Sequence, residues 1–262
     1  MGEYVARNLA RVPGAGVIGL KATRPWLKKI APAGMRFVSA FPFGKCRDAL
    51  KSLGADEVFF VGSPFSSLRP ALDRVTLSYM LKRRSFWFPH AYLYAIQDML
   101  SDSGIALRSP LDYFPELGAE LGLALGDCKS YEPSADICAA VEAASIQSWK
   151  TIRQSFIVDH GKVLMSESQT INGTDRLIKA FGLSPKRETA AFPVLCKIAV
   201  APFHKIDVPT IGAQTARLCL SNGVRAIAVE AGNTIVMQRE ELATIARSGS
   251  ICVYAIPRNA CA

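Results

Sequence analysis

Two acidic residues frame the stretch of this sequence with the most chemical potential. The segment from Lys205 to Gly232 reads KIDVPTIGAQTARLCLSNGVRAIAVEAG, with Asp207 directly before a Pro-Thr-Ile-Gly turn and Glu230 at the end of an apolar strand. Carboxylates can hold Mg²⁺ and orient a water molecule. Asp207 could instead cap the turn, and Glu230 could be a hydrogen-bonded structural group, so both interpretations stay open.

A second candidate is the turn Asn172-Gly173-Thr174-Asp175. We expect it to join a strand to a helix, with the glycine allowing close backbone approach and Thr174 able to cap the helix. The amide groups of such a helix start favour a phosphate, while Asp175 could serve a metal or simply interact with the helix dipole. Asp207, Asp175 and Glu230 would suit one Mg²⁺ if the fold brings them together.

The elements that must position these residues alternate between helix and strand. In the first half we expect a helix ending near Leu53, a strand at 57–61, helices at 70–82 and 90–102, and a strand at 105–107. In the second half we expect strands at 154–158, 162–166, 193–200, 225–229, 234–237 and 251–256, with helices at 134–149, 174–181, 213–221 and 240–247. Asp159-His160-Gly161 predicts a hairpin turn, and Ser134 or a neighbour is expected to cap the helix that it begins.

This alternation predicts an α/β protein of two domains. The polar stretch at 126–133 places the junction near residue 130. We therefore predict an N-terminal Rossmann-like domain over residues 1–130 and a C-terminal α/β domain with a mixed sheet over residues 131–262.

Composition limits the class of protein. The chain has 262 residues, half of them hydrophobic, which is enough for one large or two medium domains. It contains no apolar run of the roughly 18–20 residues that a membrane span needs, and no signal peptide, so we expect a cytoplasmic protein. The net charge of +9 would suit an anionic metabolite, an anionic membrane surface or nucleic acid. The densest basic cluster is Lys82-Arg83-Arg84, next to aromatic residues.

Seven cysteines are scattered along the chain without a C-x-x-C pair. The spacing therefore predicts neither a zinc site nor a disulfide framework. Most of these cysteines lie in apolar runs, where a cysteine acts as a small buried hydrophobe.

The second half of the chain resembles the LpxI family. The resemblance rests on residues 162–177, KVLMSESQTINGTDRL, and on the segment from Lys205 to Gly232. The G-T-D turn, D-V-P-T-I-G and A-V-E-A-G are specific in combination, although each alone would be weak. The resemblance implies a Rossmann-like domain and a C-terminal α/β domain with the substrate held between them.

The resemblance also implies a reaction and its residues. LpxI enzymes use Mg²⁺ to hydrolyse the pyrophosphate of UDP-2,3-diacylglucosamine to UMP and 2,3-diacylglucosamine 1-phosphate (lipid X), in lipid A biosynthesis. Carried over, Asp207 would be the catalytic residue. The metal ligands would be Asp207 and Asp175, and the substrate-binding residues would be Gly173, Thr174, Thr210 and Glu230.

The same resemblance bears on location and partners. The acyl chains of the substrate imply peripheral contact with the cytoplasmic membrane surface, and no nucleic acid is expected as a partner. Members of the family are often dimers, which leaves a homodimer open.

Several elements of the family pattern are replaced in this chain. Family members open with an apolar strand, and we expect this strand to be missing here, since the sequence begins at about the following helix, Tyr4–Arg11. A K-P-G-Q-D segment reads Ala199-Val200-Ala201-Pro202-Phe203, and a D-I-G-Q element reads Thr151-Ile152-Arg153-Gln154. An E-G-T-D turn begins with Asn172, an upstream Glu is Gln169, and a G-D-D element reads Phe88-Pro89-His90.

Most of these exchanges remove a polar or acidic group. A second reading is therefore a catalytically weakened or inactive homologue that binds a nucleotide sugar or a protein partner. A third is an unrelated module that binds nucleic acid or a membrane surface, which the net charge would suit.

Overall fold

The chain divides into two compact units, Met1–Tyr113 and Phe114–Ala262. The computed structural model describes residues 4–5, 8, 14, 18–20, 36–38, 43–61, 73–82, 91–126, 131–146, 153–168, 170–171, 173–200, 203–249 and 251–261. The division falls earlier than the predicted junction near residue 130. The reason is that β5 (Ala124–Leu125) pairs with β12 (Cys252–Ile256), the last strand of the second unit.

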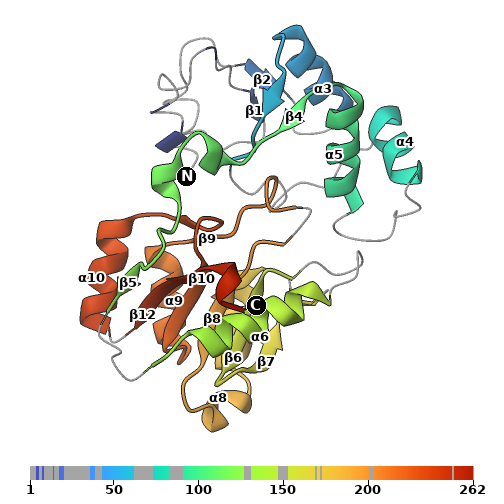
Figure 1. Cartoon of the computed structure of the whole chain (residues 1–262). Coiled ribbons are helices and arrows are strands. Elements are labelled where there is room, and N and C mark those ends of the chain that lie inside the picture. The colour runs from blue at the N-terminus through green and yellow to red at the C-terminus, as the bar shows by residue number, and fades with distance from the viewer. Residues whose placement is uncertain are drawn as a thin grey trace. The chain divides into compact units, whose positions relative to one another are not determined.

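The first unit combines short parallel strand pairs with helices (Figure 1). The strands are β1 (Ile18–Leu20) with β2 (Arg36–Val38), and β3 (Glu57–Val58) with β4 (Ala106–Leu107). The helices are α3 (Phe43–Ser52), α4 (Arg74–Lys82), α5 (Ala91–Asp102) and the short η2 (Pro110–Asp112). These elements confirm the predicted alternation of helix and strand. Phe88-Pro89-His90 and the basic residues after Lys82 lie outside the described residues.

Six strands of the second unit form one mixed sheet in the order β5-β12-β10-β8-β6-β7. The strands not yet bounded are β6 (Ser155–Asp159), β7 (Lys162–Ser166), β8 (Val194–Lys197) and β10 (Ala226–Glu230). Strands β8, β10 and β12 run parallel to one another, whereas β5 runs antiparallel to β12, and β6 runs antiparallel to both β8 and β7. The predicted α/β class with a mixed C-terminal sheet is confirmed.

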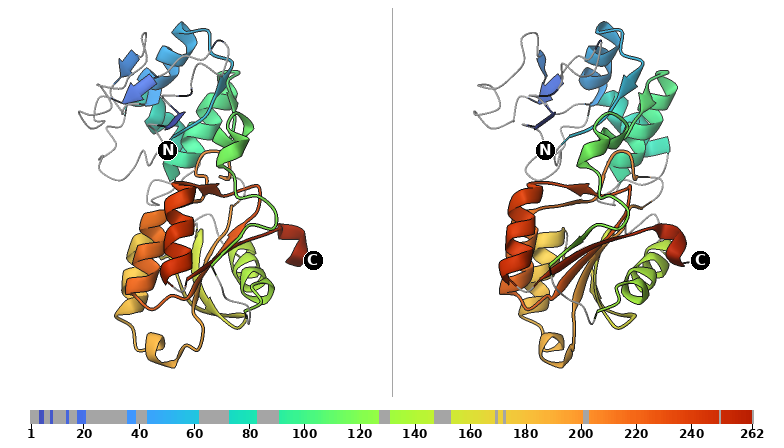
Figure 2. Two further views of the ribbon diagram at one scale, coloured as in Figure 1. Left: turned by 90° about the vertical axis from the view of Figure 1, so that its left-hand side faces the viewer. Right: turned by 60° about the vertical axis from the view of Figure 1, so that its left-hand side comes forward.

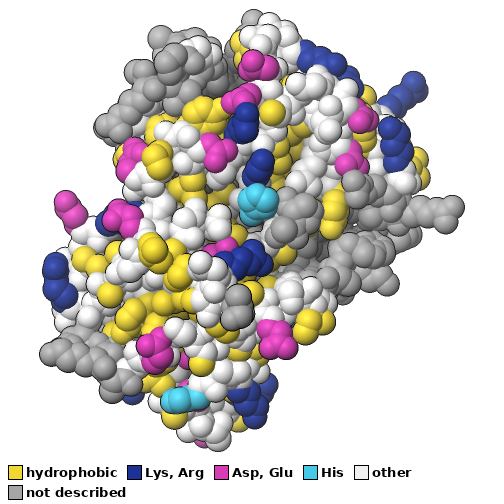
Figure 3. Space-filling view, in the orientation of Figure 1, with side chains coloured by type: hydrophobic (Ala, Val, Ile, Leu, Met, Phe, Trp, Pro, Cys, Tyr) yellow, Lys and Arg dark blue, Asp and Glu magenta, His cyan; other side chains and the backbone are white. Residues whose placement is uncertain are grey.

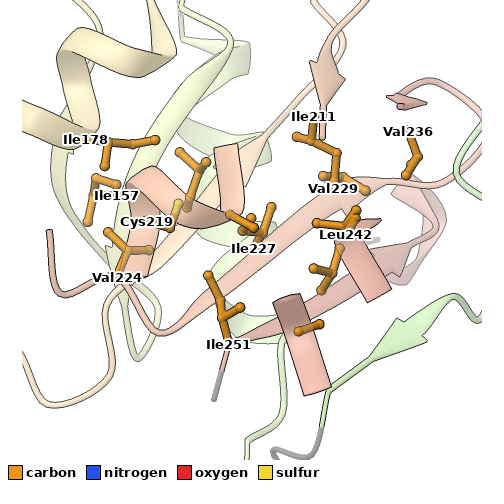
Figure 4. Close-up of a cluster of buried hydrophobic side chains, with 14 of the residues drawn as sticks. Ile157, Ile178, Ile211, Cys219, Val224, Ile227, Val229, Val236, Leu242 and Ile251 are labelled. Atoms are coloured by element: carbon orange, nitrogen blue, oxygen red, sulfur yellow. The ribbon is translucent and has the colours of Figure 1, made fainter. Parts of the chain in front are cut away.

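Helices cover both faces of this sheet (Figure 2). One face carries α6 (Ser134–Ser145), and the other carries α7 (Thr174–Gly182), α9 (Ala213–Ser221) and α10 (Arg239–Gly249). Figure 4 shows the apolar cluster on the second face, where Ile227 and Val229 of β10 meet side chains of those helices. Ala226 and Ala228 of the same strand pack against α6 instead. Alternate side chains of β10 thus pack into the two apolar clusters on opposite faces of the sheet.

Five smaller elements also belong to the described part of the second unit. They are η3 (Pro115–Leu117), α8 (Lys186–Thr189), η4 (Arg258–Cys261) and the parallel pair β9 (Thr210–Ile211) with β11 (Ile235–Val236). The N-cap position of α6 is occupied by Pro133, the neighbour of Ser134, and no side-chain hydrogen bond caps the helix. Ser134 is the first helical residue, and both its amide and its hydroxyl donate to the carboxylate of Glu132.

The expectation that no disulfide would form is also wrong. Cys138 of α6 is bonded to Cys261 of η4 across 123 residues of sequence. Cys196 and Cys219 fit the prediction instead, because both are fully buried thiols in the apolar core. Burial raises the pKa of both groups, so they remain protonated near neutral pH.

The hairpin between β6 and β7 follows the prediction and is held by Asp159. His160 and Gly161 adopt φ angles of 47° and 75°, as a two-residue turn of this hand requires. The Asp159 carboxylate accepts hydrogen bonds from the amides of Ala191 at 2.9 Å and Phe192 at 3.0 Å. Burial acts to raise the pKa of Asp159, but these bonds and the one to His160 outweigh it and lower the pKa.

We expect loss of the disulfide to destabilise the second unit. Replacing Cys138 and Cys261 together by serine, without reductant, should lower the free energy of unfolding by about 2–4 kcal/mol. The physical reason is that the unfolded chain regains conformational freedom between the two positions. Urea unfolding followed by circular dichroism measures the change, and identical midpoints for wild type and double variant would contradict it.

We expect Asp159→Ala to cost about 1–3 kcal/mol at pH 7, because two backbone amides lose their acceptor. The folded pKa lies below the ordinary value of 3.8, so this contribution is complete above that value and disappears as pH falls through the folded pKa. Urea unfolding from pH 7 to pH 3 should therefore show the difference narrowing below 3.8. His160→Ala is the control, since its ion pair with Asp159 is exposed and should contribute little. A difference that stays constant with pH would be evidence against the carboxylate's role.

Candidate functional site

A buried lysine stands at the carboxyl end of β8. Lys197 is only 7% exposed, and its Nζ donates to the main-chain oxygen of Thr210 at 3.2 Å. Burial lowers its pKa, while the carboxylates of Glu167, Asp207 and Asp175 oppose that shift. Three carboxylates from separate segments therefore act on one ammonium group. We call Lys197, Glu167, Asp175, Asp207 and Thr210 the Lys197 cluster.

The sheet fixes the direction of the lysine. Lys197 lies opposite Ser155 of β6 and Val229 of β10 in the sheet register. Leu195, two residues earlier, packs in the apolar cluster with α7, α9 and α10. Alternation along the strand places Lys197 on that same face.

The start of α7 reaches the sheet through a pair of hydroxyl groups. Thr174 Oγ1 lies 2.8 Å from Ser155 Oγ. Gly173 occupies the N-cap position with φ 94°, a conformation that glycine adopts without strain, and no side chain caps the helix. The prediction that Thr174 could cap α7 is therefore wrong, because its hydroxyl ties the helix to β6. Asp175 stands exposed in the first helical turn.

The segment that carries Asp207 is held by its backbone. Gln154 Nε2 donates to the Asp207 carbonyl oxygen at 2.6 Å, and the Asp207 amide donates to the Phe203 oxygen at 2.9 Å. Two residues later, the Pro209 oxygen accepts from the Ile235 amide at 2.8 Å, where β9 and β11 begin to pair. The Asp207 side chain is exposed on this fixed segment.

Glu167 joins the cluster from the end of β7 and differs from the two aspartates. Its Oε2 accepts hydrogen bonds from the amides of Gln154 at 2.8 Å and Ser155 at 3.1 Å. This carboxylate therefore satisfies two backbone amides at the start of β6. The exposed carboxylates of the cluster are Asp175 and Asp207. They are the ones that could hold a metal ion together with an incoming ligand or accept a proton from a water molecule.

Glu230 has a different set of neighbours. It is 1% exposed, and its carboxylate accepts from the Ala199 amide at 3.1 Å and from Asn233 Nδ2 at 2.7 Å. Arg258 Nη1 lies 3.6 Å away and also donates to the Ala199 oxygen at 3.2 Å. Alternation along β10 puts Glu230 on the face of Ala228, which packs with α6. These bonds account for its burial, and they anchor the chain that follows β8.

Of the residues predicted from sequence, Thr210 accepts the bond from Lys197 through its main-chain oxygen, and the charges of Asp175 and Asp207 act on the same lysine. Gly173 and Thr174 lie at the start of α7. Asn172, Gln169, Thr151 and Ile152 lie outside the described residues. Sequence reasoning missed Lys197 and Glu167. The available signal for the lysine was a charge inside the otherwise apolar run Val194–Val200.

No group of three or more His, Cys, Asp or Glu side chains is arranged to hold a metal ion within the part of the chain that the structure describes. Mg²⁺ sites commonly use one or two carboxylates and take further oxygens from a bound phosphate. The exposed Asp175 and Asp207 fit a site of that second kind, in which the ligand supplies part of the coordination.

Comparison with known proteins agrees with the sequence resemblance. The family model for the LpxI C-terminal domain matches residues 122–254, which is just over half of the chain and lies within the second unit. The UDP-2,3-diacylglucosamine pyrophosphatase LpxI of Caulobacter vibrioides is 28% identical over 224 residues, covering 82% of this chain and 78% of the relative. The chain belongs to the LpxI family.

Proposed function

We propose that this protein hydrolyses the pyrophosphate bond of UDP-2,3-diacylglucosamine, giving UMP and 2,3-diacylglucosamine 1-phosphate. The relative from Caulobacter vibrioides bears the name of that activity. The observation that carries the proposal is the pair of exposed carboxylates, Asp175 and Asp207, whose charges act on the buried Lys197 within the region that matches the family.

The cluster suits attack by water on a diphosphate. A new phosphorus–oxygen bond forms to water while the bridging bond breaks, so each product keeps one phosphate group. Asp207 orients the water and accepts its proton, because it is exposed on a segment held by its backbone. The amides at the start of α7 and the Lys197 charge favour the anionic phosphate oxygens.

Asp175 and Asp207 are the residues that would hold Mg²⁺ together with oxygens of the diphosphate. The ion would neutralise negative charge and make a bound water more acidic. We expect chelation with EDTA to abolish UMP release and added Mg²⁺ to restore it. Unchanged release in EDTA would remove the metal from the proposal, and a parallel circular dichroism spectrum controls for unfolding.

The diacylated product and substrate place the reaction at the cytoplasmic membrane surface, with the protein bound peripherally. In the described part of the chain, each helix is too short or too polar to serve as a transmembrane segment. A homodimer remains an expectation from the family.

A non-catalytic homologue is the second candidate, and one observation favours it. Ala199, Val200 and Phe203 are each 7% exposed or less, where the family pattern carries K-P-G-Q-D. These side chains belong to the packed interior and offer no polar group to a ligand. Substrate binding without UMP release from the wild-type protein would establish this alternative.

The third candidate is a module that binds nucleic acid or a membrane surface, and the basic net charge supports it only weakly. On the face drawn in Figure 3, the Lys and Arg side chains of the described residues are interspersed with Asp and Glu. A nucleic-acid groove is expected to present a continuous basic stripe. Binding of single-stranded nucleic acid that weakens steeply with salt, without sugar-nucleotide binding, would favour it.

We expect Asp207→Asn to lower kcat for UMP release by about 100-fold or more, because the amide cannot accept the proton or hold the metal equally well. The melting temperature should stay close to that of wild type, since the Asp207 side chain is exposed. Glu188→Gln is the matched control, an exposed acid on α8 converted to its amide. Wild-type turnover by Asp207→Asn would exclude this residue from the mechanism.

A further inference from the structure

Burying the charged side chain of Lys197 costs free energy. An ammonium group loses its hydration on burial, and replacing a buried ion pair with apolar residues of similar volume is often neutral or stabilising. The neighbours of Lys197 on its sheet face include Leu195, and an unbranched apolar side chain would suit that surrounding. Stability alone therefore gives a weak reason for a lysine here.

The hydrogen bond of Lys197 has a specific target. Its Nζ donates to the main-chain oxygen of Thr210 at 3.2 Å, which begins β9 three residues after Asp207. The other fixed point of that segment is the bond from Gln154 Nε2 to the Asp207 oxygen. The lysine thus restrains one end of the segment, and the glutamine restrains the residue that carries the carboxylate.

The charge of Lys197 has a second effect. Asp175 and Asp207 come from different segments, and like charges brought close together repel one another. Both carboxylates act on the charge of the same buried ammonium. Both aspartates are exposed to solvent.

We propose that Lys197 is a positioning residue for the active site: its ammonium, bonded to the Thr210 oxygen, holds the Asp207–Thr210 segment so that Asp207 can face an anionic ligand. Only the turnover part of this inference rests on the proposed function. The restraint on the segment is a property of the protein without ligand.

Lys197→Met tests the inference, with Lys179→Met as the matched control, since Lys179 is exposed on α7. Hydrogen exchange of the full chain should show the amides of Asp207 and Ile235 exchanging about tenfold or more faster in Lys197→Met only, because the charged hydrogen bond to Thr210 is lost. The amide of Ile227 in the sheet core should exchange at the wild-type rate in both variants, whereas loss of a purely structural lysine would accelerate exchange there as well.

In turnover of UDP-2,3-diacylglucosamine, kcat should fall about 100-fold in Lys197→Met with KM little changed, as expected when catalytic groups are misplaced. If wild type releases no UMP, the proposed function fails, and the exchange measurement still decides the role of Lys197. Unchanged exchange at Asp207 and Ile235 overturns the inference whatever the activity. If Lys197→Met does not fold, Lys197→Gln replaces it with the same expected acceleration, because its side chain is neutral and one atom shorter.

Discussion

The second unit places a buried ammonium, that of Lys197, at the carboxyl end of β8, where it is bonded to the Thr210 oxygen and acted on by the charges of three carboxylates. An isolated charge in an apolar interior would cost several kcal/mol, so the groups around it cannot be arranged independently. Glu167 is committed to two backbone amides, and Thr210 offers a carbonyl oxygen. Asp175 and Asp207 supply the remaining negative charge from the solvent side. The constraint of neutralising Lys197 therefore links β7, α7 and the chain before β9.

The two faces of the sheet position different residues at the strand ends. On one face the apolar cluster of Figure 4 supports α7 and α9, and so fixes where Asp175 stands. On the other face Glu230 binds the Ala199 amide and lies beside Arg258, whose helix is joined to α6 by the Cys138–Cys261 bond. Ala199, which follows β8, and Asp207 are thus each held by backbone hydrogen bonds, which allows the exposed Asp207 carboxylate to keep a fixed position.

Local signals in the sequence were sufficient for most elements. The bounds of β7 and α9 agree with prediction residue for residue, because turn glycines and strand alternation act within a few residues. The disulfide was not predictable, since its cysteines are 123 residues apart and neither spacing nor context marks them. The sequence did not predict Lys197 and Glu167 for the same reason. The members of the Lys197 cluster come from four segments that are far apart in the sequence and that only tertiary structure relates. Asp175 and Asp207 were found through their turns, whereas Glu167 follows an ordinary edge strand.

Replacement of the K-P-G-Q-D segment leaves fewer charged residues to recognise a ligand at this strand end. In this chain Ala199 and Phe203 are each 1% exposed, so the two positions that could have presented a lysine and an aspartate instead add to the core. Charge recognition at this strand end then falls on groups that the sheet itself positions, above all Lys197 with Asp175 and Asp207. A family fold maintains such a framework whether or not the reaction proceeds, since function depends on the site and not on the fold. The packing that keeps Lys197 buried would therefore persist in a protein that only binds its ligand. The exposed carboxylates of Asp175 and Asp207 are different, because they are useful to a ligand that brings a metal ion or a reactive phosphate.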